Sequence, residues 1–394
     1  MTQDFEIAII GGGMTGLSCA LGLAQKGFKI AVIDTKPLSD KFNQENDPDR
    51  VSAVNLASEK LLQSLKVWPK IISTRSGIYT SMHVCDANTS AVLEFHAEEV
   101  SESNLGHIVE NDLITSTLLK KIGQNDVEIL APKAIREIEY QDQGAHWQLT
   151  LSDGQLITAP LIIGADGANS FIREHFDFDC RKTPYHHDAI IATIQLEKAH
   201  QNGAYQQFLN QGILALLPLH KPHLASFVYS LDPSSAKRLI TLDQAYFEAM
   251  LQARFNQRFG QIELVTKAKS FPLIERHVNR YYRKGIVLIG DAAHSVHPLA
   301  GQGANLGFAD VTALIQTLDK AKQSGRNFAA EDTLDAYERQ RKLANTLMLK
   351  GVKGIKTLFE KQNFALKFAR KAGISAVNNN TLLKRFFIRQ AMGT

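Results

Sequence analysis

The sequence predicts an α/β fold in which a parallel sheet covered by helices is joined to a second domain with its own β-sheet and to a helical C-terminal region. Three observations predict it. Residues 5–34 read as a strand, a glycine cluster, a helix and a second strand. Residues 180–271 are mainly strand-like, and the chain after Leu306 is mostly helical. Short apolar strands that alternate with helices are typical of parallel sheets buried on both faces.

The size and composition of the chain fit a protein of two domains. It has 394 residues, of which 44% are hydrophobic and 21% charged, so a sizeable core is expected. Cys19, Cys85 and Cys180 lie far apart and form no CxxC pair, so we expect a reducing compartment and no zinc site. Residues 7–25 carry no charge, but three consecutive glycines interrupt them, so we interpret them as a buried strand, turn and helix. We therefore expect a cytoplasmic protein.

Positive charge is concentrated at the C-terminus. The whole chain carries 44 − 40 = +4, whereas residues 340–394 hold twelve Lys or Arg and one acid, 12 − 1 = +11, which leaves 4 − 11 = −7 elsewhere. Leu382, Leu383, Phe386 and Phe387 fall on one helical stripe beside basic residues. This segment fits the inner surface of an anionic membrane or another protein, but a solvated face or packing within the chain fits as well. Nucleic acid is not expected, because no recognition motif accompanies the charge.

The first glycine cluster has the spacing of a dinucleotide-binding turn. Residues 11–16 read GGGMTG between a strand and a helix. Gly11 permits a tight turn, Gly13 lets the backbone approach a pyrophosphate, and Gly16 lets helix and strand pack closely. The start of the helix offers free N–H groups to phosphates. Asp34 lies 18 residues beyond Gly16, at the end of the second strand, where it can bind ribose hydroxyls. The pattern predicts a Rossmann-like domain but leaves NAD and FAD open.

Two later segments also place turns after buried strands. Residues 161–170 read LIIGADGANS and present Asp166, although an ordinary surface turn followed by a solvated helix would look the same. Residues 290–307 read GDAAHSVHPLAGQGANLG, and their strand delivers Asp291 where its carboxylate can accept from a polyol chain. Pro298 and the glycines after it leave room for a flat ring, and the helix that follows directs N–H groups at negative charge. A reduced flavin, which is anionic at one edge of its ring, fits this third segment.

In this order and at these separations, the three segments resemble the class A flavoprotein monooxygenases of the para-hydroxybenzoate hydroxylase type. The resemblance covers residues from about 5 to 345. Within that superfamily, HPLAGQGANLGFAD, LGHIVEN and the C-terminal IRQAMG resemble the ubiquinone-biosynthesis hydroxylases. Together with GILALLPL, they are most similar to the bacterial 2-polyprenylphenol hydroxylase branch, which hydroxylates the ring of a prenylated phenol.

The resemblance implies FAD as the cofactor and NAD(P)H as a transient co-substrate. The motif positions correspond in this sequence to Gly11, Gly13, Gly16, Asp34, Arg50, Asp166, Asp291, Pro298, Gly301, Gly303 and Asn305. The first four would hold the ADP half of FAD, and the last four would lie near the isoalloxazine ring. Arg50 would lie close to the flavin, Asp166 would serve both FAD and NAD(P)H, and Asp291 would bind the ribityl chain. Glu110 stands where many members carry an arginine, a departure that the ubiquinone branch shares.

The resemblance also implies how the chain divides into domains. The FAD-binding domain would comprise residues 1–75, 104–178 and 272–345, the substrate domain residues 76–103 and 179–271, and a helical basic tail residues 346–394. NAD(P)H would reduce the flavin, O2 would add to give a C4a-hydroperoxide, and its distal oxygen would attack an electron-rich phenol. A pocket between the two domains would exclude water, because the hydroperoxide otherwise decays to hydrogen peroxide.

The sequence identifies no catalytic base and leaves three kinds of function open. His294 and His297 lie in the third segment, but packing or hydrogen-bonding roles are the favoured interpretation for both. The first function is an aromatic ring hydroxylase of ubiquinone synthesis. The second is another flavoenzyme of this fold, such as an epoxidase or a reductase of isoprenoid chains, and the third is a non-catalytic flavoprotein scaffold. The ring carbon, the prenyl length and the choice between NADH and NADPH stay open.

Overall fold

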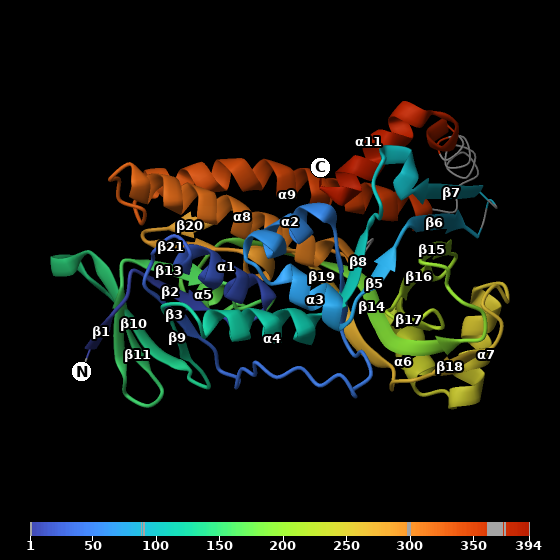
Figure 1. Ribbon diagram of the computed structural model, residues 1–394, viewed down its shortest axis with the longest axis horizontal. Helices are drawn as coiled ribbons and strands as arrows, with labels where there is room; N and C mark the ends of the chain where they lie inside the picture. The colour runs from blue at the N-terminus through green and yellow to red at the C-terminus, as the bar shows by residue number, and fades with distance from the viewer. Residues whose placement is uncertain are drawn as a thin grey trace.

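The computed structural model describes residues 2–87, 89, 91–297, 301–360, 373 and 376–393. It confirms the predicted α/β class: a mainly parallel sheet, a larger second sheet and a helical C-terminal region, together with two small sheets (Figure 1). The domain limits expected from the sequence stay a prediction.

The parallel sheet has six strands in the order β20-β21-β13-β2-β3-β9. All neighbours run parallel except β20, which is antiparallel to β21. The strands are β2 (Ile7–Ile10), β3 (Ile30–Ile33), β9 (Val127–Leu130), β13 (Leu161–Gly164), β20 (Tyr282–Arg283) and β21 (Ile286–Leu288). Every residue of β2, β3 and β13 is buried, which explains why these strands are continuously apolar rather than alternating.

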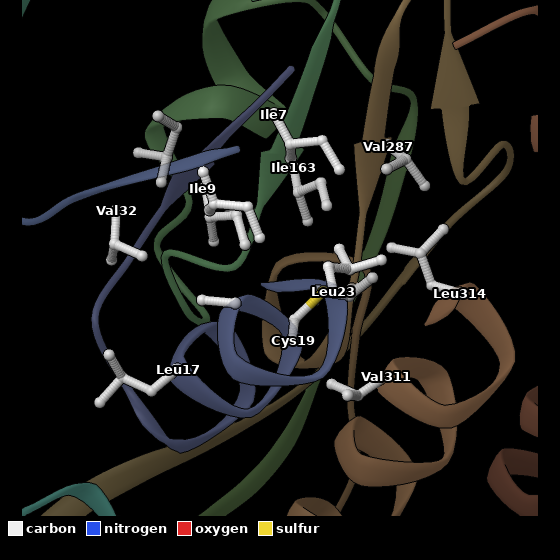
Figure 2. Packing of buried hydrophobic residues seen from close by; sticks show 14 of the residues in the cluster. Ile7, Ile9, Leu17, Cys19, Leu23, Val32, Ile163, Val287, Val311 and Leu314 are labelled. Carbon is white, nitrogen blue, oxygen red and sulfur yellow. The ribbon is translucent and has the colours of Figure 1, made fainter. Parts of the chain in front are cut away.

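Helices α1 (Met14–Ala24) and α8 (Gln302–Gln323) contact each other and pack against the parallel sheet, and α4 (Asn111–Ile122) contacts α1. Figure 2 shows how apolar side chains of α1 and α8 meet those of the strands. Its labels mark Ile7, Ile9, Leu17, Cys19, Leu23, Val32, Ile163, Val287, Val311 and Leu314. The predicted strand–helix–strand unit is therefore confirmed. Cys19 of α1 is buried in this core, and burial raises the pKa of its thiol.

The larger sheet has nine strands and unites segments that lie far apart in the sequence. Its order is β22-β19-β14-β17-β16-β15-β6-β7, and β18 pairs with β14 beside this path. The strands are β6 (Ser81–Asp86), β7 (Ala91–His96), β14 (Cys180–Leu196), β15 (Gly203–Leu209), β16 (Gly212–Pro218), β17 (Leu224–Leu231), β18 (Ile262–Leu264), β19 (Lys269–Val278) and β22 (His294–Ser295). Strand β6 joins by parallel pairing with β15, and β22 by antiparallel pairing with β19.

Helices α6 (Pro233–Ile240) and α7 (Gln244–Arg254) pack against this sheet with Ala236, Leu239, Phe247 and Leu251. The sequence predicts one helix over residues 242–259 at this place. The structure has two shorter ones, each with an aspartate cap, because Asp232 and Asp243 accept hydrogen bonds from backbone N–H groups of the first turns. The two short helices lie at the right of Figure 1.

The four-stranded sheet contacts the parallel sheet, and the three-stranded sheet contacts strand β16 of the nine-stranded sheet. The four-stranded sheet has the order β1-β12-β11-β10, and the three-stranded sheet has the order β4-β8-β5. Their strands, and the remaining short helices, are β1 (Thr2–Asp4), β10 (Ile135–Gln141), β11 (His146–Leu151), β12 (Leu156–Ala159), β4 (Val51–Val54), β5 (Gly77–Tyr79), β8 (Gly106–Glu110), α2 (Leu56–Ser64), α3 (Trp68–Thr74), α5 (Phe171–His175), η1 (Ala97–Val100), η2 (Asp142–Gly144) and η3 (Gly290–Ala292). The Asp153-Gly154 pair is typical of a hairpin turn, and it joins the antiparallel strands β11 and β12.

Helix α9 (Glu331–Glu360) joins the two large sheets at the C-terminal side (Figure 1). It packs on α8 and β20, and it continues past residue 345 to the nine-stranded sheet, where Val352 packs with Phe208 and Ile213. Helix α11 (Thr381–Met392) then packs on η1 through its buried Ile388 and Met392. Across the residues that the structure describes, we find no helix with the length and apolar character needed to cross a membrane.

Candidate active site

The three predicted segments meet at one edge of the parallel sheet. Strands β2, β13 and β21 are parallel neighbours, so the turns that follow them lie side by side. A Cβ atom on Gly11 would lie 2.4 Å from the carbonyl oxygen of Ala165, and one on Gly290 would lie 3.1 Å from the Thr15 side chain. This edge, at the carboxyl ends of the strands, is where α/β proteins bind nucleotides.

The first turn has the shape that a pyrophosphate requires. Gly11 has a φ of +112°, which only glycine adopts readily, and a Cβ on Gly16 would lie 1.9 Å from the Gly11 carbonyl oxygen. By contrast, a Cβ on Gly13 would meet no protein atom within 4 Å. Gly13 is also the N-cap of α1, where no side chain caps the helix and no acidic residue lies in the first turn. The helix N-terminus is therefore open to an anionic group, and the residues present fit FAD.

Asp34 lies beside this turn, as the sequence predicts. Its Oδ2 accepts a hydrogen bond of 2.6 Å from the Gly12 N–H, and its Oδ1 accepts one of 2.8 Å from the Lys36 N–H. The side chain is half-buried at the end of β3. Each carboxylate oxygen has a further lone pair, so Asp34 can also accept from ribose hydroxyls.

The second segment places Asp166 in a dry environment. Burial raises the pKa of its carboxyl group, although hydrogen bonds from Ser170 and from the Ile172 N–H oppose the rise. Its Oδ1 is buried without a hydrogen-bond partner. A buried acceptor of this kind is costly, by about 1–3 kcal/mol, unless a ligand or water completes it. Asp166 is therefore suited to bind a donor at this edge of the sheet.

Arg173 ties the second segment to the third. Its side chain is 1% exposed, and it donates to the carbonyl oxygens of Ala168 at 2.9 Å and Ala292 at 3.1 Å. The alternative interpretation, in which this residue lies on a solvated helix, is therefore wrong. The guanidinium fixes the spacing between the turns that carry Asp166 and Asp291.

Asp291 is exposed to solvent at the start of the third segment, yet desolvation raises the pKa of its carboxyl group. The positive fields of His294, Arg50 and Arg276 oppose this rise. Arg50 is exposed just before β4, and its charge is among those that lower the pKa of Asp291, so the two predicted residues lie within electrostatic range of each other.

A buried ionic network that the sequence analysis missed supports the third segment. Asp310 of α8 is fully buried and accepts from His294 Nε2 at 2.5 Å, Arg341 Nε at 2.7 Å and the Gly290 N–H at 3.0 Å. Burial alone would raise the pKa of Asp310, but His294 and Arg341 hold it at about 2. Asn345 of α9 also donates to Asp310 at 3.2 Å. The signal in the sequence was an aspartate within the apolar run of α8, because such a charge needs partners.

The end of the third segment begins α8. Gly301 is the N-cap with a φ of +63°, and a Cβ there would lie 2.7 Å from the Cβ of Ala53. The amide of Asn305 holds β4 and α2: it donates to the Ala53 carbonyl at 2.9 Å and accepts from Ser58 Oγ at 2.7 Å. Among the residues that the structure describes, none has an atom within 4 Å of a Cβ built on Gly303. Pro298 lies outside the described residues. Contacts of these residues with a flavin stay a prediction.

Glu110 has a partner that the sequence analysis missed. Arg75 binds it through Nε at 2.5 Å and NH2 at 2.7 Å, and both side chains are nearly buried. The same guanidinium donates to the carbonyl oxygens of Gln44 and Asn46 at 2.8 Å each. Glu110 therefore anchors the long loop between β3 and β4, which leads to Arg50.

The two histidines of the third segment differ in their surroundings. His294 is bonded to Asp310 through Nε2, which supports the structural role favoured for it. His297 is 2% exposed, and its Nε2 lies 3.0 Å from Ser230 Oγ of β17. Its Nδ1 is buried and has no hydrogen-bond partner. His297 therefore keeps a buried ring nitrogen for a further interaction.

Comparisons with known proteins agree with this geometry. A family model described as "FAD binding domain" matches residues 4–351. The chain is 34% identical over 393 residues to the 3-demethoxyubiquinol 3-hydroxylase of Escherichia coli, and the alignment covers 99% of each chain. It is 33% identical over 434 aligned positions to the mitochondrial ubiquinone biosynthesis monooxygenase COQ6 of Drosophila melanogaster. This alignment covers 100% of this chain and 90% of that relative.

A solved structure has the same fold. The crystal structure of the p-nitrophenol 4-monooxygenase PnpA from Pseudomonas putida superposes with a TM-score of 0.79 over 99% of this chain and 98% of that chain. The two sequences are 16% identical, so this likeness bears on the fold alone.

Proposed function

Since the chain belongs to the FAD-dependent monooxygenases of the ubiquinone-biosynthesis hydroxylase family, we propose that it hydroxylates the aromatic ring of a prenylated phenol or benzoquinol intermediate. Within the family we assign it to the 2-polyprenylphenol hydroxylase branch. The observation that carries the proposal is the meeting of the glycine turn, Asp166 and Asp291 at one sheet edge, with β22 paired into the nine-stranded sheet.

The residues at this edge would divide the work of binding the cofactor. FAD, when bound, takes electrons from NAD(P)H and activates O2. Gly11, Gly13 and Gly16 would hold its pyrophosphate against the start of α1, and Asp34 would hold its ribose. Asp291 would bind the ribityl chain, with the positive charge of Arg50 within electrostatic range of its carboxylate.

The substrate ring would lie between the third segment and the nine-stranded sheet. Strand β22 brings this segment directly to β19, and Val296 packs near the apolar side chains of Phe208, Ile213 and Val352. An apolar surface beside the reacting ring suits a prenylated substrate and keeps water from the site. The E. coli relative is named as a hydroxylase of a demethoxyubiquinol, which is consistent with a ring of this type.

The decisive experiment supplies the purified FAD-loaded protein with NADPH, O2 and a short-chain prenylphenol. We expect a product heavier by one oxygen atom, with the added oxygen on the ring when the product is fragmented. Oxygen on the prenyl chain would identify an epoxidase, and addition of two hydrogens a reductase. NADPH consumption without an oxidised product would refute the proposal. Quinone-intermediate profiles of a deletion strain, complemented with this gene, would identify the ring position.

We also propose that α11 holds the protein against the inner surface of an anionic membrane, where a polyprenyl substrate resides. The helix is docked through one face, because Ile388 and Met392 are buried and Lys384 pairs with Glu99 at 2.8 Å. Its other face exposes 79% of Leu382 and 55% of Phe386, with Arg385 and Arg389 beside them. Apolar and basic side chains on one exposed face suit an anionic lipid surface.

Paired substitutions test the membrane proposal without disturbing the docked face. We expect the double variant Leu382→Ser with Phe386→Ser to bind phosphatidylglycerol vesicles at least about tenfold more weakly in sedimentation. Each of the two apolar side chains would contribute about 1.5–3 kcal/mol to binding when it enters the lipid. Leu343→Ser with Leu347→Ser is the matched control, because these α9 residues are 67% and 60% exposed. Equal loss in both pairs, or no loss in the first, would contradict the proposal.

A further inference from the structure

A cavity of about 700 Å³ lies between helices α1, α2, α4 and α8. Helices α1 and α8 both begin at the sheet edge where the three segments meet, and the cavity is reached farther along, at Gln25 after α1 and at Gln316 of α8. At 1.5 Å per residue, these positions lie roughly 18 Å from Gly13 and roughly 22 Å from Gly301 along the helices. Volumes of about 300–1,000 Å³ are typical of small-molecule sites. The cavity is therefore large enough for a small molecule, and it is separate from the edge that fits FAD.

Three lysines border the cavity, each near the C-terminal end of a different helix. Lys26 follows α1, Lys66 follows α2, and Lys121 lies in the last turn of α4. As far as the chain is described, the lining contains no acidic residue. The border of the cavity is therefore positively charged.

The helix ends themselves do not use this charge. Lysines near a helix C-terminus commonly donate to its last carbonyl oxygens and so offset the helix dipole. Here amide side chains take that place: Asn125 Nδ2 donates to the Lys121 carbonyl at 2.8 Å, and Gln25 Nε2 lies 3.5 Å from the Leu65 carbonyl oxygen. The ammonium groups are therefore left for other partners.

One of the three ammonium groups stays unpaired. Nζ of Lys121 donates to Gln124 Oε1 at 2.9 Å, and Nζ of Lys26 pairs with Asp319 at 2.8 Å. Among the described residues, none forms a hydrogen bond or an ion pair with the Lys66 ammonium. Lys66 also has a φ of +60° at the position after α2, where glycine is the usual residue. A lysine that keeps this conformation and an unpaired charge suits an anionic ligand.

The inner wall of the cavity is apolar. Leu61, Leu65 and Ile315 line it and are at most 9% exposed. A Cβ on Gly22 would lie 2.2 Å from Ile315 Cδ1, so α1 and α8 are closely packed behind this wall. A ligand that contacts both the wall and the lysines needs an apolar body and an anionic head.

We propose that this cavity binds a phosphate-bearing amphiphile, with its head held by Lys66 and Lys121 and its apolar body against Leu65 and Ile315. Lysine is a compact point charge that binds phosphate groups well, and a doubly charged head can engage two lysines at once. The proposal is independent of the hydroxylase reaction, since none of these residues belongs to the predicted flavin site. A free prenyl diphosphate and the headgroup of a phospholipid share this chemistry.

Calorimetric titration of the FAD-loaded full-length protein tests the ligand. The probes are geranyl diphosphate for a free diphosphate and dihexanoyl phosphatidic acid for a lipid, and the tighter of the two identifies the source. Bound FAD occupies the turn at Gly13, so the probes do not compete for it. We expect inorganic pyrophosphate, which lacks the apolar body, and geraniol, which lacks the anionic head, to bind at least about tenfold more weakly than the tighter probe. Failure of both probes to bind, or equal binding of pyrophosphate or geraniol, overturns the proposal.

Charge variants locate the bound head. Lys66→Gln with Lys121→Gln should weaken binding of the tighter probe at least about tenfold. Lys60→Gln with Lys120→Gln is the matched control, because these are exposed lysines of α2 and α4 outside the cavity. Equal losses in the two double variants, or no loss in the first, would place the probe elsewhere and overturn the proposal.

A bulky side chain tests the cavity itself without a change of charge. Ser64 of α2 is exposed and lines the cavity, so Ser64→Trp should fill part of it and weaken binding at least about tenfold while the core stays intact. Gln63→Trp is its control, because the neighbouring Gln63 is exposed and lies outside the cavity. Tight binding to Ser64→Trp shows that the cavity is not the site.

Discussion

Substitution of Asp310 by asparagine tests whether the buried ionic network stabilises the fold. The carboxylate is 0% exposed and binds Arg341 and Asn345 through one oxygen and His294 and the Gly290 N–H through the other. Asparagine keeps only one oxygen, and its NH2 group takes the place of the other. In one orientation of the amide this NH2 group faces Arg341, and in the other it faces the Gly290 N–H, so a donor meets a donor in both cases. The charge that pairs Arg341 is also lost. Removal of one partner of a buried ion pair costs about 3–5 kcal/mol.

We therefore expect Asp310→Asn to lower the free energy of unfolding by about 4 kcal/mol, a large part of the ~5–15 kcal/mol typical of a folded protein. The assay is urea denaturation of the FAD-free protein, followed by circular dichroism. Asp319→Asn, on the same helix, is the control: Asp319 pairs with Lys26 at 2.8 Å near the surface, and its loss should cost no more than about 1 kcal/mol. If the two variants lose the same stability, the network does not support the third segment.

The remaining predictions concern pH, the first turn and the C-terminal helix. Because the folded state holds the pKa of Asp310 at about 2, below its ordinary 3.8, the stability that it contributes is present above pH 4 and is lost as the pH falls towards 2. The gap in unfolding free energy between the wild type and Asp310→Asn should therefore narrow over that range in acid titrations. Gly13→Ala should fold normally but bind FAD at least about tenfold more weakly by fluorescence titration, whereas Gly16→Ala should fail to fold, because its Cβ would lie 1.9 Å from a carbonyl oxygen. Ile388→Ala should cost about 2–4 kcal/mol of local stability and expose α11 to limited proteolysis, with unchanged flavin content.

Local patterns in the sequence predicted the parallel sheet, and the family resemblance implied that the three segments hold one cofactor. The apolar run before Gly11 is typical of a strand buried on both faces, and parallel strands bring their carboxyl ends to one edge. The short turn at Gly154, which has a φ of +85°, was predicted for the same local reason. Predictions of this kind succeed because the interactions that decide them lie within a few residues of one another.

The buried network around Asp310 and the contact between Ser230 and His297 could not be predicted, because their members are far apart in the sequence. Asp310 and Arg341 are separated by 31 positions, and Ser230 and His297 by 67. Only the tertiary packing of α8, α9 and the nine-stranded sheet brings them together. The helical character of the chain after Leu306 was predicted and α9 confirms it, but the packing of Val352 with Phe208 and Ile213 could not be predicted, because these residues are also far apart in the sequence.

Helix α9 contacts both large sheets, one near each of its ends. Its 30 residues span roughly 45 Å, with one end on α8 and β20 and the other against Phe208 and Ile213 (Figure 1). Gly351 and Gly354 lie near the contact with the nine-stranded sheet, and no atom of the described residues would lie within 4 Å of a Cβ on either. Each glycine lowers helix stability by about 1 kcal/mol relative to alanine. The helix propensity of α9 is therefore lowest where the helix reaches the nine-stranded sheet. The contacts of Val352 with Phe208 and Ile213 therefore stabilise the part of α9 that has the weakest helix propensity.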